Sequence, residues 1–218
     1  MAALMCAASA AKADPIACDT PLIVVVAASP DLAARVCRVA AEADAMLSAL
    51  GLRHSRPVTI EVTPDLGVSA AGCVAYFHTG GAVLTILPPD CLEGEDGRLG
   101  PFPKLAAGPL FESLVIHELA HAYVEDSAAP DSLPRLVHEY IAYAAQLDYL
   151  SKPDRDGILR RSKADLPVDL AGFSEALLNF APDRFAAMAW LHLRAQPKPA
   201  DMVQALLDGT ARFEIWDE

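Results

Sequence analysis

The stretch VIHELAHAY, residues 115–123, decides how the rest of the chain is interpreted. It holds the pattern His-Glu-x-x-His inside an apolar run that favours a helix. Positions four apart share one face of a helix, so His117 and His121 would aim two imidazoles at one point, as a tetrahedral zinc site requires. Glu118 would lie about 100° further around the axis, where it could reach a water on the metal without binding the metal. The stretch therefore predicts a metal-binding helix.

An ordinary amphipathic helix with two histidines and a solvated glutamate is the competing interpretation, because three fixed residues make a weak motif. The flanking positions weigh against it, since they carry no proline, glycine or charge: Leu114, Val115, Ile116, Leu119, Ala120 and Ala122. A glutamate buried among them would be costly without a partner, and a water on the metal supplies one.

A catalytic zinc usually takes three protein ligands and keeps one position for water, so a third donor is needed. The sequence after His121 lacks the Gly-x-x-His extension of the three-histidine sites. Glu139 lies in a second predicted helix, residues 133–150, which a short connector lets return antiparallel to the first. We predict Glu139 as the third ligand. Glu125 or Asp126, on the helix of His121, and His138, next to Glu139, remain alternatives.

With this third position, residues 111–149 resemble the gluzincin branch of the zinc metallopeptidases, which carry H-E-x-x-H and then a ligand glutamate on a second helix. The resemblance implies an α+β, zincin-like fold: a twisted mixed β-sheet packed on the active-site helix, an edge strand over the cleft and a helical C-terminal half. It implies His117, His121 and Glu139 as zinc ligands and Glu118 as the general base.

The sequence departs from the gluzincin pattern around the third ligand. The family's Asn-Glu pair is His138-Glu139 here, and the carboxylate often found four residues after the ligand glutamate is Tyr143. The groups that orient the ligand histidines are therefore not the ones that the family pattern supplies.

The resemblance implies hydrolysis of peptide bonds in a peptide or protein substrate, with a zinc-activated water deprotonated by Glu118. A further donor must stabilise the oxyanion, and the candidates are Tyr140, Tyr143, Tyr149 and His192. We take Tyr143 and His192 as catalytic candidates, the latter because related enzymes use a downstream tyrosine or histidine. An ordinary core histidine is the competing interpretation of His192. Two other functions remain open: a zincin-fold module that binds zinc without catalysis, and a structural protein without metal.

Composition restricts the class of protein. The chain has 218 residues, of which 53% are hydrophobic and 21% charged, which predicts one globular domain. A net charge of −12 disfavours nucleic acid and anionic membranes as partners, since no basic stripe is present. No stretch after the N-terminal segment reaches the roughly 18 apolar residues of a membrane span.

The N-terminal segment and the cysteines predict export. Residues 1–13 look like a signal peptide, with an apolar run at 2–10 and a small-x-small cleavage pattern at 11–13, although no basic residue precedes the run. An alanine-rich helix is the alternative. Cleavage would leave an even number of cysteines, in one of three pairings: Cys18, Cys37, Cys73 and Cys91. Two disulfides in a periplasmic or secreted protein are the simplest interpretation, and four cytosolic thiols are the alternative.

Local patterns predict the remaining elements of a single domain, residues 14–218. In its sheet-rich part, residues 14–108, strands at 21–28 and 57–63 flank a helix that starts at the cap Ser29 and ends at Gly51, which makes a parallel βαβ unit. A hairpin follows, with strands at 73–79 and 82–87. The second of these strands could take an extended peptide at the sheet edge.

The helical part, residues 109–218, carries the metal site. Its first helix should run from about 109 to 125, and Ser132 should cap the second. Residues 151–167 read as a loop or short helix, and three further helices are expected at 173–180, 182–196 and 199–208, with an edge strand or docked tail at 212–216. Among the remaining histidines, we expect His78 near the cleft and His54 in solvent.

Overall fold

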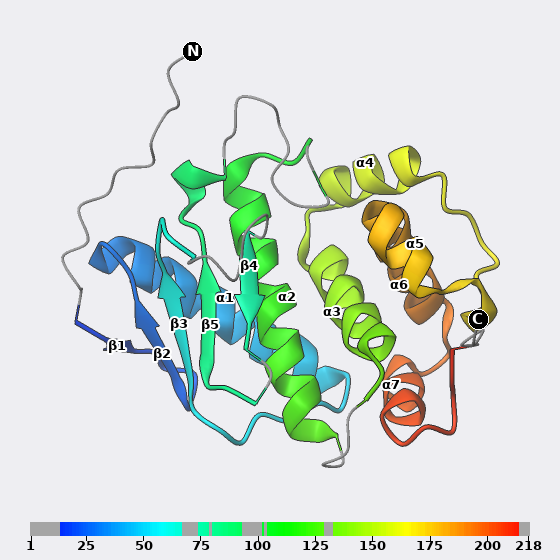
Figure 1. Ribbon diagram of the computed structural model, residues 1–218, viewed down its shortest axis with the longest axis horizontal. Helices are drawn as coiled ribbons and strands as arrows, with labels where there is room; N and C mark the ends of the chain where they lie inside the picture. Colours follow the sequence, from blue (N-terminus) through cyan, green and yellow to red (C-terminus); the bar gives the residue numbers. More distant parts are fainter. Residues whose placement is uncertain are drawn as a thin grey trace.

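The computed structural model describes residues 14–66, 74–78, 80–92, 102, 104–128 and 133–213 (Figure 1). Its sheet has the strand order β1-β2-β3-β5-β4. The strands are β1 (Ile16–Ala17), β2 (Ile23–Val26), β3 (Val58–Val62), β4 (Ala75–Phe77) and β5 (Val83–Ile86). The three central strands β2, β3 and β5 run parallel, whereas β1 and β4 pair antiparallel at the two edges. The fold is therefore mixed α+β, as predicted.

The predicted βαβ unit is confirmed. Helix α1 (Pro30–Ala49) connects β2 to β3, and these strands pair in parallel. The hydroxyl of Ser29 accepts a hydrogen bond from the backbone N–H of Leu32, which satisfies a donor in the first turn. Gly51 follows the helix with a φ of +80°, the left-handed conformation that ends many helices and favours glycine.

The predicted hairpin is confirmed as β4 and β5, but the expected open edge is wrong. β5 lies between β3 and β4, so its backbone groups on both sides are used within the sheet. Among the described residues, the edge strand on this side of the sheet is β4. The short edge strand β1 was not predicted, and Cys73, the predicted start of the hairpin, lies outside the described residues.

The C-terminal half is helical, as expected. Its helices are α2 (Ala107–Ser127), α3 (Arg135–Tyr149), α4 (Lys152–Ser162), α5 (Glu175–Phe180), α6 (Pro182–Ala195) and α7 (Pro199–Leu207), with short 3₁₀ turns at Pro89–Cys91 and Leu170–Gly172. Residues 151–167, for which the sequence allowed a loop or a short helix, contain helix α4. α3 lies between α2 and α6, and α2 also packs against α1 and β4 (Figure 1). α2 therefore belongs to both halves of the molecule.

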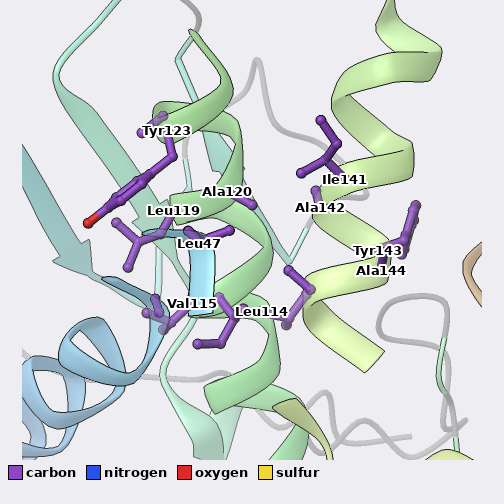
Figure 2. Packing of buried hydrophobic residues seen from close by; sticks show 14 of the residues in the cluster. Leu47, Leu114, Val115, Leu119, Ala120, Tyr123, Ile141, Ala142, Tyr143 and Ala144 are labelled. Atoms are coloured by element: carbon purple, nitrogen blue, oxygen red, sulfur yellow. The ribbon is translucent and has the colours of Figure 1, made fainter. Parts of the chain in front are cut away.

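Helix α2 is buried on nearly every side, because its apolar residues are spread around the whole helix and not gathered on one face. Figure 2 shows Val115, Leu119 and Tyr123 on the side of α2 that faces Leu47 of α1. α3 covers another side, and its predicted apolar stripe is buried: Leu136, Tyr140, Tyr143, Leu147 and Leu150. Any polar side chain in the middle of α2 must therefore find its partners inside the protein.

A disulfide joins Cys18, directly after β1, to Cys37 in α1. It is one of the pairings that the sequence left open. Cys91 is disulfide-bonded as well. In the described part of the chain, no helix is long and apolar enough to cross a membrane. The predicted signal peptide, the cap Ser132 and residues 214–218 lie outside the described residues.

The expectation that His54 lies in solvent is wrong. Its side chain is 4% exposed and its ring stacks on Tyr123, with centroids 4.9 Å apart. Its Nδ1 lies 3.2 Å from Oδ2 of Asp126. Burial nevertheless lowers the pKa of His54, against the opposing effect of Asp126. The loop before β3 folds back onto the end of α2, which a local reading of a polar segment does not reveal.

Glu112 connects three helices. Its carboxylate accepts hydrogen bonds from Arg35 at 2.8 Å and Arg38 at 2.6 Å, both in α1, and from the Tyr149 hydroxyl of α3 at 2.7 Å. Burial alone would raise the pKa of Glu112, but the hydrogen bonds from Tyr149 and Arg35 outweigh it and lower the pKa. The ionised carboxylate thus stabilises the packing of α1, α2 and α3.

We predict that Glu112→Gln lowers the free energy of unfolding at neutral pH by about 1–3 kcal/mol, because an amide cannot accept from all three donors. Urea denaturation measures the change. Since the folded-state pKa lies below the ordinary value, the carboxylate's contribution is complete above that value and is lost as the pH falls through the folded-state pKa. The difference between the two proteins should shrink accordingly on acidification.

Glu42→Gln is the matched control. Glu42 pairs with Arg38 on the surface of α1, and such a pair contributes less than about 1 kcal/mol. Equal losses in the two variants would contradict a special role for Glu112.

Candidate metal centre

Three side chains from two neighbouring helices converge on one another. His117 and His121 come from α2 and Glu139 from α3, and their potential ligand atoms all lie within 4.8 Å of one another. His121 Nε2 is 3.2 Å from His117 Nε2, and Oε2 of Glu139 is 3.5 Å from the same His117 atom. His117 is buried, and the other two residues are half-buried. We call these three residues the metal cluster, since they could hold a metal ion.

The charges of the metal cluster suit a cation. Burial would raise the pKa of Glu139, but the hydrogen bond and charge of His117 outweigh it and lower the pKa to about 2. Burial, reinforced by the charge of His117, lowers the pKa of His121 to about 3. Burial would lower the pKa of His117, but its hydrogen bond with Glu139 and the charges of Glu118 and Glu139 outweigh burial and raise the pKa. At neutral pH Glu139 is therefore ionised and His121 is neutral, the states that metal ligands need, whereas binding would displace the proton that the raised pKa favours on His117.

Glu118 lies beside the metal cluster but is not one of its members. It is 6% exposed, and burial raises its pKa to about 7, opposed by His117 and reinforced by Glu139. The backbone N–H of Phe77, in the edge strand β4, donates a hydrogen bond to it. A carboxyl group with a pKa near neutrality can both take up and release a proton under ordinary conditions.

The structure brings one of the two further catalytic candidates to the metal cluster. The rings of Tyr143 and His117 are 4.5 Å apart between centroids, and burial, with the charges of Glu139 and Glu118, raises the pKa of Tyr143. His192 lies elsewhere, where its Nδ1 is 2.7 Å from the hydroxyl of Tyr140. Its environment is that of a core histidine.

The alternative third ligands are occupied elsewhere or lie outside the metal cluster. Glu125 accepts the backbone N–H of Gly80 at 3.0 Å, and Asp126 accepts the backbone N–H of Ser55 at 2.8 Å. Both also pair with Arg56. The ring centroid of His138 is 5.9 Å from that of His121, and His138 contributes no atom to the cluster.

Two buried polar residues beside the metal cluster were missed in the sequence. Gln146 of α3 places Oε1 at 3.1 Å from Nδ1 of His117. Its Nε2 donates to the hydroxyl of Ser113 at 3.1 Å, and Ser113 donates to the backbone carbonyl of Leu110 at 2.9 Å. The available signal was spacing: Gln146 lies two helical turns after Glu139 and Ser113 one turn before His117, so each shares a face with a cluster residue.

Arg135 lies at the exposed side of the metal cluster and was also missed. Its Nε is 3.8 Å from Oε1 of Glu139, in the same helix. Its Nη1 donates to Glu175 at 2.9 Å and to Asn179 at 3.1 Å, both in α5. Arg135 therefore connects Glu139 to α5.

A cavity of about 650 Å³ lies in another part of the protein, bounded by α1, α3, α6 and the start of α7. Its walls are mostly apolar, with Met46, Ala145 and Trp190 among them. No member of the metal cluster lines it, so it is separate from the candidate metal centre.

Comparison with known proteins identifies a family and no activity. No curated protein and no solved structure matches the chain. Residues 23–216 match a family described as "Family of unknown function (DUF6639)". This span includes all of α2 and α3, and with them the metal cluster and the residues hydrogen-bonded to it. Because the match covers most of the sequence, the chain belongs to the DUF6639 family.

Proposed function

We propose that this protein is a zinc-dependent, metallopeptidase-like hydrolase with a zincin-like fold. The observation that carries the proposal is the convergence of His117, His121 and Glu139, with Glu118 buried beside them. Two imidazoles and one carboxylate form the ligand set of one large class of catalytic zinc sites, which leave the fourth position open.

The sheet supports the zincin-like part of the proposal. β4 is an antiparallel edge strand that lies beside α2, which is the place the gluzincin resemblance implies for the strand along the cleft. We propose that a peptide or protein substrate binds along β4, on the side away from β5.

The proposed chemistry divides between the metal ion and two residues, Glu118 and Tyr143. Zinc, when bound, would lower the pKa of a water and polarise the carbonyl of the substrate. Glu118 takes a proton from the attacking water and passes it to the leaving amine, a role that suits its pKa of about 7. Tyr143 stabilises the oxyanion. Of the tyrosine candidates, Tyr140 contacts His192 and Tyr149 is bonded to Glu112, whereas Tyr143 packs against His117.

Export is part of the proposal and rests on the disulfide between Cys18 and Cys37, since such bonds persist in oxidising compartments. A periplasmic or secreted location would suit a hydrolase that acts on peptides outside the cytosol.

One observation favours a second candidate function, a zinc-binding module without catalysis. The carboxylate of Glu118 accepts the backbone N–H of Phe77, so the edge strand already uses part of its capacity. The two functions share the metal cluster and differ in whether Glu118 is needed only for structure.

We predict about one zinc per chain by elemental analysis of the purified protein. In Glu139→Ala the affinity for zinc should fall by more than the roughly 10–100-fold that loss of an outer partner costs, because a direct ligand is removed. Glu175→Ala is the matched control, since Glu175 also pairs with Arg135 but contributes no atom to the metal cluster. Zinc content that is indifferent to Glu139 would refute the assignment of the third ligand.

We predict that Glu118→Gln binds zinc as the wild type does but hydrolyses peptides about 10²–10⁴-fold more slowly, the usual contribution of a general base. A mixture of fluorogenic peptides, with zinc content measured in parallel, provides the test. If wild type and variant both hold zinc and neither cleaves any peptide, the non-catalytic function is the correct one.

A further inference from the structure

A chain of hydrogen bonds behind His117 has only one consistent direction. It ends at the backbone carbonyl of Leu110, which can only accept, so the hydroxyl of Ser113 donates to it. The oxygen of Ser113 therefore accepts from the amide nitrogen of Gln146, which turns the amide oxygen of Gln146 toward Nδ1 of His117. An amide oxygen cannot donate, so Nδ1 must carry the hydrogen.

This direction determines which nitrogen of His117 is free to bind a metal. A metal needs the neutral ring, which has given up the proton shared with Glu139. With the hydrogen on Nδ1, that neutral ring has its lone pair on Nε2. That atom lies 3.2 Å from Nε2 of His121 and 3.5 Å from Oε2 of Glu139. The lone pair therefore points at the place where the other two ligands meet.

We infer that Gln146, oriented by Ser113, is the positioning residue of the metal centre: it fixes the ring and tautomer of His117 so that Nε2 is offered to the ion. This inference rests on the proposed metal site and deepens it. Gln146 and Ser113 are both 0% exposed, so water cannot replace either hydrogen bond.

The choice of an amide over a carboxylate has an electrostatic reason. Zinc-bound histidines commonly donate to a carboxylate, which adds a negative charge behind the ring. Here Glu118 and Glu139 already place two carboxylates in the buried region around His117. A third would be costly to bury in the metal-free protein. Gln146 supplies the same acceptor geometry without the charge, which leaves a bound divalent ion with more of its own positive charge.

The test is the zinc affinity of the full-length protein, stripped by a chelator and titrated with zinc against a chromophoric competitor. Gln146→Leu keeps the approximate volume and removes the acceptor. We expect its Kd for zinc to rise 10–100-fold. Gln146→Glu restores the acceptor and should bind zinc at least tenfold more tightly than the leucine variant, while its metal-free form unfolds at lower urea than the wild type.

Gln196→Leu is the matched control. Gln196 also lies next to a histidine, with its Nε2 3.3 Å from Nε2 of His192, but neither residue contributes an atom to the metal cluster. The same substitution there should leave the Kd for zinc unchanged. A merely structural role for Gln146 predicts that the glutamate variant does not recover affinity.

Ser113→Ala provides a second route if the leucine variant fails to fold. Without the serine hydroxyl the amide of Gln146 can turn over and donate to Nδ1 of His117, so part of the neutral ring should carry its hydrogen on Nε2 and offer no lone pair to zinc. ¹⁵N NMR of the histidine rings should show this mixture of tautomers in the variant and the Nδ1-protonated tautomer alone in the wild type. Zinc binding in Gln146→Leu within twofold of the wild type would overturn the inference, whereas absence of zinc binding in the wild type itself would overturn the proposed function.

Discussion

The burial of α2 is the constraint on which the rest of the structure depends. A helix enclosed by α1, β4 and α3 cannot leave a polar side chain unpaired without a large penalty in stability. The ring of His117 is hydrogen-bonded to the amide oxygen of Gln146, and the carboxylate of Glu118 to the backbone N–H of Phe77. The neighbouring elements therefore have to supply polar groups at fixed heights along α2, and this requirement sets the alignment of α3 and the hairpin against it as firmly as apolar packing does.

Features determined within a short segment could be predicted from the sequence. The proline and glycine at the ends of α1 mark its limits, because they act on the local backbone. The place of β5 inside the sheet could not be predicted, because it depends on pairing with β3, which the local alternation of residues does not specify. The burial of His54 was missed for the same reason, since Tyr123 and Asp126 belong to a distant segment.

The candidate site likewise has residues that could be predicted from the sequence and residues that could not. The two histidines and Glu139 follow from helical spacing and a short connector, both of which are visible in the sequence. The separation of Tyr143 from His192 is not, because it depends on how α6 packs on α3 and turns His192 toward Tyr140. Gln146 looks like an isolated polar residue until Ser113 is seen opposite it. Outer partners of a metal site carry no motif of their own, and only the antiparallel pairing of two helices brings them together.

The double membership of α2 has a mechanical consequence. One side of this helix is packed into the layer that contains the sheet, while α3, which contributes Glu139, is packed on α6 in the helical layer. An ion bound by residues of both α2 and α3 would hold the two layers together. At a free ion concentration about a thousand times its Kd, binding would stabilise the folded protein, in which the layers are packed together, by about 4 kcal/mol. The rigidity of the whole domain would then follow the supply of metal in its surroundings.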